Sequence, residues 1–314
     1  MFRFFLSRIG QTLAVLFTVS VIIFALMRMI PGDPVLMMLG DDFTQEAYER
    51  LRSQLGFDRS IVTQYLIWLQ GILRGDLGDS YLNHERVSVL VWDAFLPTLS
   101  LVVASMLVGI LVAVPSGIVA AMRKDSAWDW GSMGFAIFVY SMPSFWKGII
   151  LIWIFSVHLR WFPAVGYVHP WDDIWEGSWR LVLPAITLGT FFSGLVARII
   201  RSSLLEVLDQ DYIKAARARG VRRAALVYRH ALANAMIPVV TVIGLQFGTL
   251  LGGAVLTETV FGIPGMGRLT VAAILNRDYA IVQGAILVGV LAVVVVNLAV
   301  DLTYAFLNPR IRVA

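Results

Sequence analysis

The feature that most constrains this chain is a series of long stretches almost free of charge. The first runs from Ile9 to Met27, between Arg8 and Arg28, and an α-helix needs about 20 such residues to cross a hydrocarbon core of about 30 Å. Five further stretches follow, at about 97–122, about 131–157, 181–197, about 235–257 and 279–300. Charged residues make up only 15% of the chain, against about 25% in soluble domains. The pattern predicts an all-α polytopic membrane protein with six transmembrane helices.

The region between the first two stretches has a different character. Residues 31–95 are polar, with acids outnumbering bases, and carry helical periodicity at about 45–55 and at 60–73. We expect these two helices to pack on each other and the segment 75–80 (GDLGDS) to form a loop. The chain thus divides into an N-terminal tail with the first span (1–30), a helical segment outside the membrane (31–95) and a five-helix core (96–314). No small-residue cleavage site follows the first span, which we interpret as an uncleaved anchor.

The distribution of basic residues predicts the orientation. Six spans place both termini on one side. That side, with the N-terminus, 123–130, 198–234 and the C-terminus, holds 14 lysines and arginines, against nine on the other. Cytoplasmic loops carry the excess of such residues. The sequence therefore predicts cytoplasmic termini and an external 31–95 segment.

Several kinds of site are excluded by what the sequence lacks. It has no cysteine, so disulfides, thiolate metal sites and cysteine nucleophiles are ruled out. The dipeptide Gly-Lys does not occur, which removes a Walker-type nucleotide site. No basic run alternates with aromatic residues as a nucleic-acid surface requires. The histidines have no metal-ligand spacing, so no metal site is predicted; they are His84, His158, His169 and His230.

The richest basic loop contains a compact polar segment, residues 211–220 (DYIKAARARG). Asp211 provides a helix start signal and Gly220 a stop signal. The intervening residues make about two turns, or about 12 Å of helix. Because so short a helix is marginal in water, tertiary contacts or a partner must hold it. The alternative is a loop that only fixes topology or touches anionic lipid.

Two features lie inside the predicted spans. Lys147 occupies the third span, where a charge is costly and commonly functional, so we expect it to face a translocation path and attract a substrate carboxylate. The alternatives are snorkelling or a structural pair with an acid such as Asp301. Pro143 should kink the same span. Glycines spaced by four give span five a smooth face, either for the path or for helix packing: Gly244, Gly248 and Gly252.

The segment 211–220 resembles the cytoplasmic signature of the inner-membrane permease subunits of ABC importers, in the dipeptide, oligopeptide and glutathione group. Two departures stand out: Lys214 occupies the usual glutamate position, and the expected proline is displaced, with Ala233 near its place and Pro238 further on. Other stretches agree with the same family along the whole chain: Ile30–Pro34 (IPGDP), Gln54–Asp58 (QLGFD), Gly75–Gly78 (GDLG), Glu258–Leu269 (ETVFGIPGMGRL) and Arg277–Tyr279 (RDY).

The resemblance implies a type I ABC importer transmembrane fold in a bacterial inner membrane. It implies a non-enzymatic subunit that passes a peptide-like solute from an external binding protein by alternating access, beside a second permease subunit and two ATP-binding subunits that hold ATP and Mg. The chain itself would bind no cofactor and contact membrane lipid. An ion-coupled secondary transporter and an intramembrane enzyme are the alternatives. Residues implied in ATPase coupling are Asp211, Tyr212, Lys214, Ala215, Ala216, Arg217, Arg219 and Gly220; those implied in binding-protein contact are Glu258, Phe261, Pro264 and Gly265.

Overall fold

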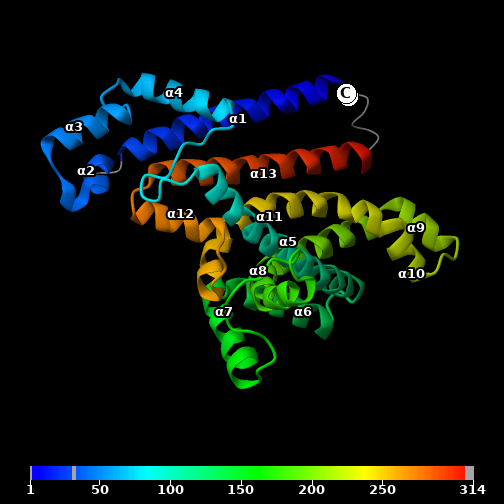
Figure 1. The fold of residues 1–314 in the computed structure, drawn as a ribbon. Helices are drawn as coiled ribbons and strands as arrows, with labels where there is room; N and C mark the ends of the chain where they lie inside the picture. The colour runs from blue at the N-terminus through cyan, green and yellow to red at the C-terminus, as the bar shows by residue number, and fades with distance from the viewer. Residues whose placement is uncertain (1, 30–32, 308–314) are drawn as a thin grey trace. The chain divides into compact units, whose positions relative to one another are not determined.

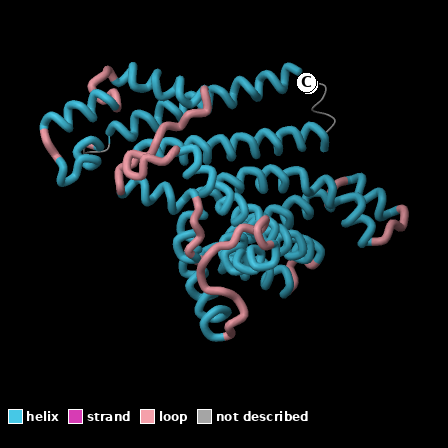
Figure 2. The backbone as a smooth tube through the Cα atoms, in the orientation of Figure 1, coloured by secondary structure: helices cyan, strands magenta, loops and turns pink. Residues whose placement is uncertain are grey.

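The computed structural model describes residues 2–29 and 33–307. Within these ranges the chain consists of helices and loops (Figure 2). The helices are α1 (Phe2–Met29), α2 (Pro34–Leu39), the short 3₁₀ turn η1 (Gly40–Asp42), α3 (Gln45–Gln54), α4 (Ile61–Leu73), α5 (Val87–Met122), α6 (Ala127–Ser141), α7 (Ser144–Leu151), the π-helical η2 (Ile152–His158), α8 (Ile174–Leu208), α9 (Asp211–Ala218), α10 (Arg223–Ala225), the π-helical η3 (Leu226–Ala231), α11 (Leu232–Phe261), α12 (Met266–Leu275) and α13 (Tyr279–Leu307).

The membrane-crossing helices agree with the prediction in number. In the described part of the chain, five helices are long and apolar enough to cross a membrane, or six if the bent pair α6 and α7–η2 counts as one span. Their bounds are wider than predicted, since α5 begins at Val87 rather than near 97 and α8 spans 174–208 rather than 181–197. A helix of 35 residues is about 50 Å long, so its charged end extends past a core of about 30 Å. Hydrophobicity marks only the part inside lipid.

The chain forms two compact units, which can be located by residue number with the colour bar of Figure 1. The first contains residues 1–96 and 268–294, and the second contains residues 97–267 and 295–314. The topological division at residues 30 and 95 stays a prediction.

In the first unit α4 packs on α1. The ring of Phe24 lies 5.4 Å from that of Tyr65 and 5.7 Å from that of Trp68. The expectation that the helices at 45–55 and 60–73 pack on each other is not met, because α3 instead packs on α2. Both helices are amphipathic, and sequence periodicity does not say which apolar surface each one covers.

The segment 75–80 is a loop, as predicted, and it is fixed to the start of α13. The Ser80 hydroxyl donates to Asp278 Oδ2 at 2.6 Å, and the Tyr81 backbone N–H donates to the same oxygen at 3.1 Å. Burial raises the pKa of the neighbouring Tyr81 to about 12, above its ordinary value of about 10. The residues directly after the GDLG motif and the aspartate of the RDY motif therefore belong to one polar cluster.

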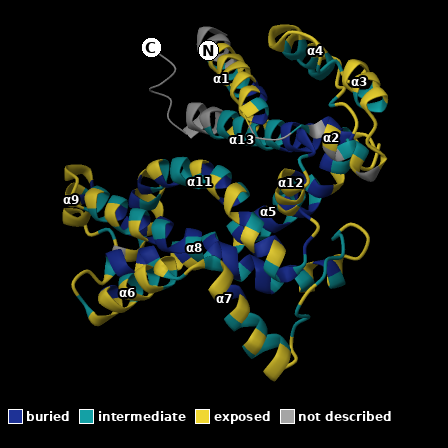
Figure 3. Ribbon diagram, turned by 90° about the vertical axis from the view of Figure 1, so that its left-hand side faces the viewer, coloured by how far each residue is buried: buried dark blue, intermediate teal, exposed yellow. Residues whose placement is uncertain are grey.

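The second unit is built around α8, the most deeply buried long helix in Figure 3. It packs against α6, α7 and α11. Small residues permit the close approach to α5: a Cβ at Gly189 would lie 2.4 Å from the Ser105 carbonyl oxygen. Since α8 leads directly into α9, this buried rod connects the core to the polar segment at 211–220.

Candidate functional site

The predicted short helix is present as α9, residues 211–218. Its start differs from the prediction by one residue. Gln210 has the extended backbone of an N-cap and makes no side-chain capping bond, while Asp211 is the first helical residue. Asp211 therefore does not cap the helix; its carboxylate lies in the first turn, where it interacts favourably with the helix dipole.

The end of α9 agrees with the prediction. Gly220 has φ of +81°, a left-handed conformation that glycine adopts without steric cost. Two hydrogen bonds close the end, from Val221 N–H to the Ala216 carbonyl at 3.3 Å and from Gly220 N–H to the Arg217 carbonyl at 3.0 Å. This is the Schellman arrangement, which directs the chain sharply away from the helix axis.

Tertiary contacts hold α9 in place, as its shortness requires. It packs on the end of α8 and on η3. Ile213 is fully buried and anchors the helix, although sequence reasoning did not single it out. The signal was available, because Ile213 is the one aliphatic residue larger than alanine in the segment. From the start of α11, Asn234 Nδ2 donates to the Tyr212 hydroxyl at 2.8 Å.

The opposite face of α9 is open. Lys214 Nζ lies 3.1 Å from Asp209 Oδ1 and 3.9 Å from Asp211 Oδ1, so the unusual positive charge is partly balanced within the chain. These pairs are exposed and contribute little to stability. Ala216 is half-buried, and the other predicted coupling residues are exposed: Asp211, Tyr212, Lys214, Ala215, Arg217, Arg219 and Gly220. Six of the eight lie in α9, and Arg219 and Gly220 follow directly at its C-terminal end (Figure 1).

The predicted kink at Pro143 is a full break. The helix pair α6 and α7–η2 is bent by 101°, and Pro143 is the N-cap of α7. Proline cannot continue the hydrogen bonding of α6, so carbonyls near its end need other donors.

Lys147 supplies such a donor. Its side chain is buried, and Nζ donates to the Val139 carbonyl of α6 and to Thr190 Oγ1 of α8, both at 3.3 Å. A cation at the carbonyl end of a helix is stabilised by the helix dipole. The expectation that Lys147 faces a path is not supported by this burial. Among the alternatives, a structural role fits, with a carbonyl and a hydroxyl as partners; Asp301 lies where side chains are not described.

The glycine face of α11 is not uniform. A Cβ at Gly244 would lie 2.4 Å from a methyl of Val300 on α13, whereas one at Gly252 would meet nothing within 4 Å. Gly244 is therefore a packing contact, as the alternative interpretation required. Gly248 is half-buried and Gly252 is exposed, so their place in a path stays a prediction.

The C-terminal end of α11 and the loop that follows it contain several buried residues. Glu258 is fully buried, and its Oε1 accepts from Thr98 Oγ1 at 2.6 Å. Thr98 Oγ1 in turn accepts from the Met266 N–H at 2.8 Å. Phe261 and Gly265 are also buried, so direct contact with a binding protein is not supported for these three residues; only Pro264 is exposed. The motif instead fixes the loop that presents Pro264.

Gly265→Ala tests this account of the loop. The added Cβ would lie 2.2 Å from the Glu258 carboxylate. We therefore expect the free energy of unfolding of the purified protein to fall by about 1–3 kcal/mol, and its melting temperature to fall with it. Gly253→Ala is the control, because its Cβ would make an ordinary contact of 3.7 Å with Leu188. Equal melting temperatures for the two variants in detergent would contradict the packing described.

An ion pair missed by the sequence reasoning joins α6 to α8. Arg201 Nε and the terminal nitrogen Nη2 donate to the two carboxylate oxygens of Asp129, each at 2.6 Å. Asp129 is buried, and Asp125 N–H donates to it at 3.0 Å. Both residues stand where an apolar stretch meets a charged loop, which is the only sequence signal for the pair.

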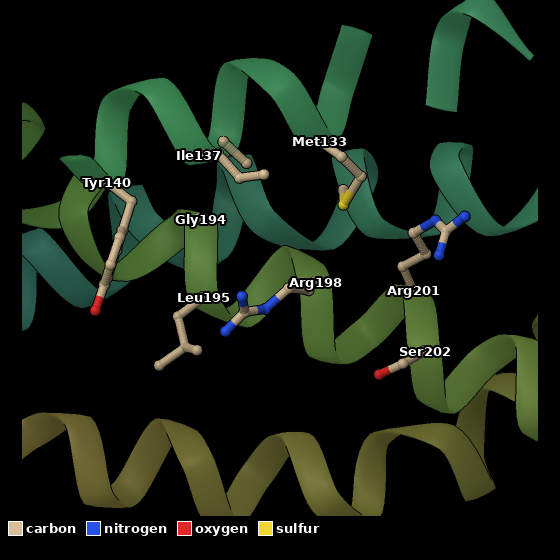
Figure 4. A pocket seen from close by; sticks show the side chains of 9 residues that line it. Met133, Ile137, Tyr140, Gly194, Leu195, Arg198, Arg201 and Ser202 are labelled. Carbon is tan, nitrogen blue, oxygen red and sulfur yellow. The ribbon is translucent and has the colours of Figure 1, made fainter. Parts of the chain in front are cut away.

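Beside this pair a cavity of about 220 Å³ lies between α6 and α8 (Figure 4). Tyr140, Ile137 and Leu195 line one part, Met133 lies with Arg201 and Ser202 in the other, and the Arg198 guanidinium lies between them, directed toward Leu195. The Tyr140 ring stacks on Phe191, with centroids 4.8 Å apart. The lining residues are Met133, Ala136, Ile137, Tyr140, Gly194, Leu195, Arg198, Arg201 and Ser202.

Comparison with known proteins identifies the family. The family model described as "Binding-protein-dependent transport system inner membrane component" matches residues 113–313, and the model of the N-terminal part of such membrane components matches residues 1–102. The Dipeptide transport system permease protein DppB of Escherichia coli (strain K12) is 42% identical, covering 99% of each chain. A putative peptide transport system permease protein of Brucella abortus is 42% identical over 98% of each chain.

Solved structures confirm the fold. An inward-facing structure of the MetNI methionine ABC transporter matches with a TM-score of 0.58 and 16% identity, covering 70% of this chain and 96% of the other. An amino acid ABC transporter with histidines matches with a TM-score of 0.53, covering 69% and 94%. At this identity the likeness concerns the fold alone. Taken with the matches along the full sequence, it shows that the chain belongs to the family of inner-membrane components of binding-protein-dependent transport systems, as a permease subunit of an ABC importer.

Proposed function

We propose that this permease subunit imports a dipeptide or a similar peptide-like solute. The observation that carries the proposal is the 42% identity to the dipeptide permease of Escherichia coli, which extends over 99% of both chains. The solute would be handed over by an external binding protein and released to the cytoplasm by alternating access. The proposed orientation has both termini in the cytoplasm, as the basic loops indicate.

The energy would come from two partner ATPase subunits, which hold ATP and Mg, while this chain binds no cofactor. The sequence has no Gly-Lys dipeptide for a nucleotide loop of its own. A second permease subunit would complete the membrane pair. The alternatives of an ion-coupled transporter and an intramembrane enzyme find no support in the family.

The coupling element in this proposal is α9. Its exposed face carries two arginines, which can pair with carboxylates on a partner, and the small Ala215, which allows close approach. Because Ile213 is buried and α9 packs on α8 and η3, a displacement of α9 would be passed to the long core helices. A loosely attached loop would absorb it instead.

Crosslinking tests this role. Cysteine is absent from the chain, so Ala215→Cys and, as control, Ala127→Cys each introduce a single reactive thiol. Both residues are exposed on the proposed cytoplasmic side. We expect a bifunctional reagent to join Ala215→Cys to an ATPase subunit in the purified importer, and Ala127→Cys to be joined much less. Equal crosslinking at both positions would overturn the assignment of α9.

Lys147→Met tests whether Lys147 has a structural role at the bend between α6 and α7 or faces the translocation path. If Lys147 holds α6 to α8 and α7, the variant should lose thermal stability and import neutral and acidic peptides equally poorly, whereas Lys147→Arg should keep most of both. The readouts are the melting temperature in detergent and uptake of two labelled dipeptides that differ in charge. A selective loss of the acidic peptide at normal stability would return Lys147 to the translocation path.

A further inference from the structure

The cavity between α6 and α8 has a polarity that changes along its length. Ile137, Tyr140 and Leu195 line one part of it, and Arg198, Arg201 and Ser202 follow further along α8. In Figure 4 the arginines and the serine project from the same helix that carries Leu195, and the Arg198 guanidinium is directed back toward Leu195. The polarity therefore changes along the α8 side, while the α6 side stays apolar as far as Met133. From Gly194 to Ser202 the helix rises about 12 Å, so the change from apolar to cationic takes place within one small cavity.

One positive charge at the polar end is uncompensated. Arg201 is paired bidentately with Asp129, so their charges cancel. Arg198 is exposed, and no carboxylate of a described residue pairs with it. Its guanidinium presents a fork of donors that suits a phosphate group. The cavity therefore offers one free cationic group beside an apolar channel.

The polarity matches the membrane in the proposed orientation. The Arg198 end of α8 faces the cytoplasmic surface, where anionic headgroups lie, and the Tyr140 end faces the hydrocarbon interior. A phospholipid has the same order of groups, with its phosphate at the surface and its acyl chains below. Basic pockets between transmembrane helices on this side bind such headgroups in other proteins. A solute in a water-filled path would not require this gradient.

We propose that the cavity between α6 and α8 binds one anionic phospholipid, with its phosphate on Arg198 and an acyl chain along Ile137, Leu195 and Tyr140. The Arg201–Asp129 pair positions the two helices on either side of the lipid. This assignment rests on the proposed orientation of the permease and is independent of the solute it carries.

Native mass spectrometry of the purified importer complex tests the proposal, with phosphatidylglycerol and phosphatidylethanolamine of identical acyl chains as probes. We expect the complex to retain phosphatidylglycerol in preference to phosphatidylethanolamine. Arg198→Gln should reduce this retention about fivefold, because it removes one cation that attracts the anionic headgroup. Arg198→Lys keeps the charge and should restore the retention. Arg222→Gln is the matched control, since it removes a charge from an exposed arginine that does not line the cavity. Unchanged retention in Arg198→Gln would overturn the proposal.

A second pair of variants tests the apolar part. Ile137 and Phe138 are neighbouring exposed residues of α6, and only Ile137 lines the cavity. Ile137→Trp should displace the lipid, whereas Phe138→Trp should not. Two other outcomes overturn the proposal: crosslinking of Ile137→Cys to the second permease subunit, which would mean that protein covers the cavity, or a raised KM for acidic peptides in Arg198→Gln with lipid retention unchanged. Lipid retention is measured without transport, so failure of the peptide assignment is seen separately.

Discussion

Ala215→Trp is expected to reduce ATP-driven uptake at least tenfold while the protein stays in the membrane at normal abundance. Ala215 is exposed on α9, so the fold should tolerate the change. A tryptophan would prevent close approach of a partner groove, and the loss of about 1.4 kcal/mol of docking free energy corresponds to a factor of ten. Uptake and ATP hydrolysis by the reconstituted importer are the measurements.

Ala127→Trp serves as the control for Ala215→Trp. It makes the same substitution at another exposed alanine on the proposed cytoplasmic side, at the start of α6. Gly220→Val gives an independent test, because φ of +81° is strained for a β-branched residue and the exit of α9 should be disturbed. Normal uptake in both Ala215→Trp and Gly220→Val would remove α9 from the coupling mechanism.

Arg201→Gln is expected to destabilise the protein by about 3 kcal/mol or more, because it leaves the buried Asp129 carboxylate without its main partner. The double variant Asp129→Asn/Arg201→Gln should recover part of this loss, since the uncompensated charge is gone. The control is Arg50→Gln, which breaks an exposed pair with Glu46 of similar length, 2.8 Å, and should cost less than about 1 kcal/mol.

Thermal unfolding in detergent gives these differences in stability. The decisive comparison is between Arg201→Gln and Arg50→Gln, because each removes one guanidinium from one ion pair, and the Arg201 pair is bidentate and more buried on both sides than the Arg50 pair. If both variants unfold at the same temperature, the Asp129–Arg201 pair does not hold α6 to α8 as the structure indicates.

The sequence predicted the helical spans well because their signal is local. Apolar runs, the loop at 75–80 and the stop at Gly220 depend on neighbouring residues, and each is found where expected. Helix bounds were less accurate, since α5 and α8 continue past their apolar parts. Asp211 carries the sequence signal for the start of the helix, but the extended backbone of the N-cap lies one residue earlier, at Gln210.

Contacts between distant residues could not be predicted in this way. The Asp129–Arg201 pair and the hydrogen bond from Thr98 to Glu258 join residues 72 and 160 positions apart. A lysine inside an apolar stretch marks Lys147 as unusual, but its partners Val139 and Thr190 depend on the bend at Pro143 and on where α8 lies. Residue type indicated that these polar groups were important, and only the fold supplied their partners.

The most direct test of the central claim is solute uptake by the complete importer reconstituted in proteoliposomes. We predict that a labelled dipeptide enters only when the binding protein, ATP and hydrolysis-competent ATPase subunits are all present, and that an ion gradient alone drives no uptake. Uptake driven by an ion gradient after removal of the ATPase subunits would contradict the claim that this chain is the permease of an ATP-driven peptide importer.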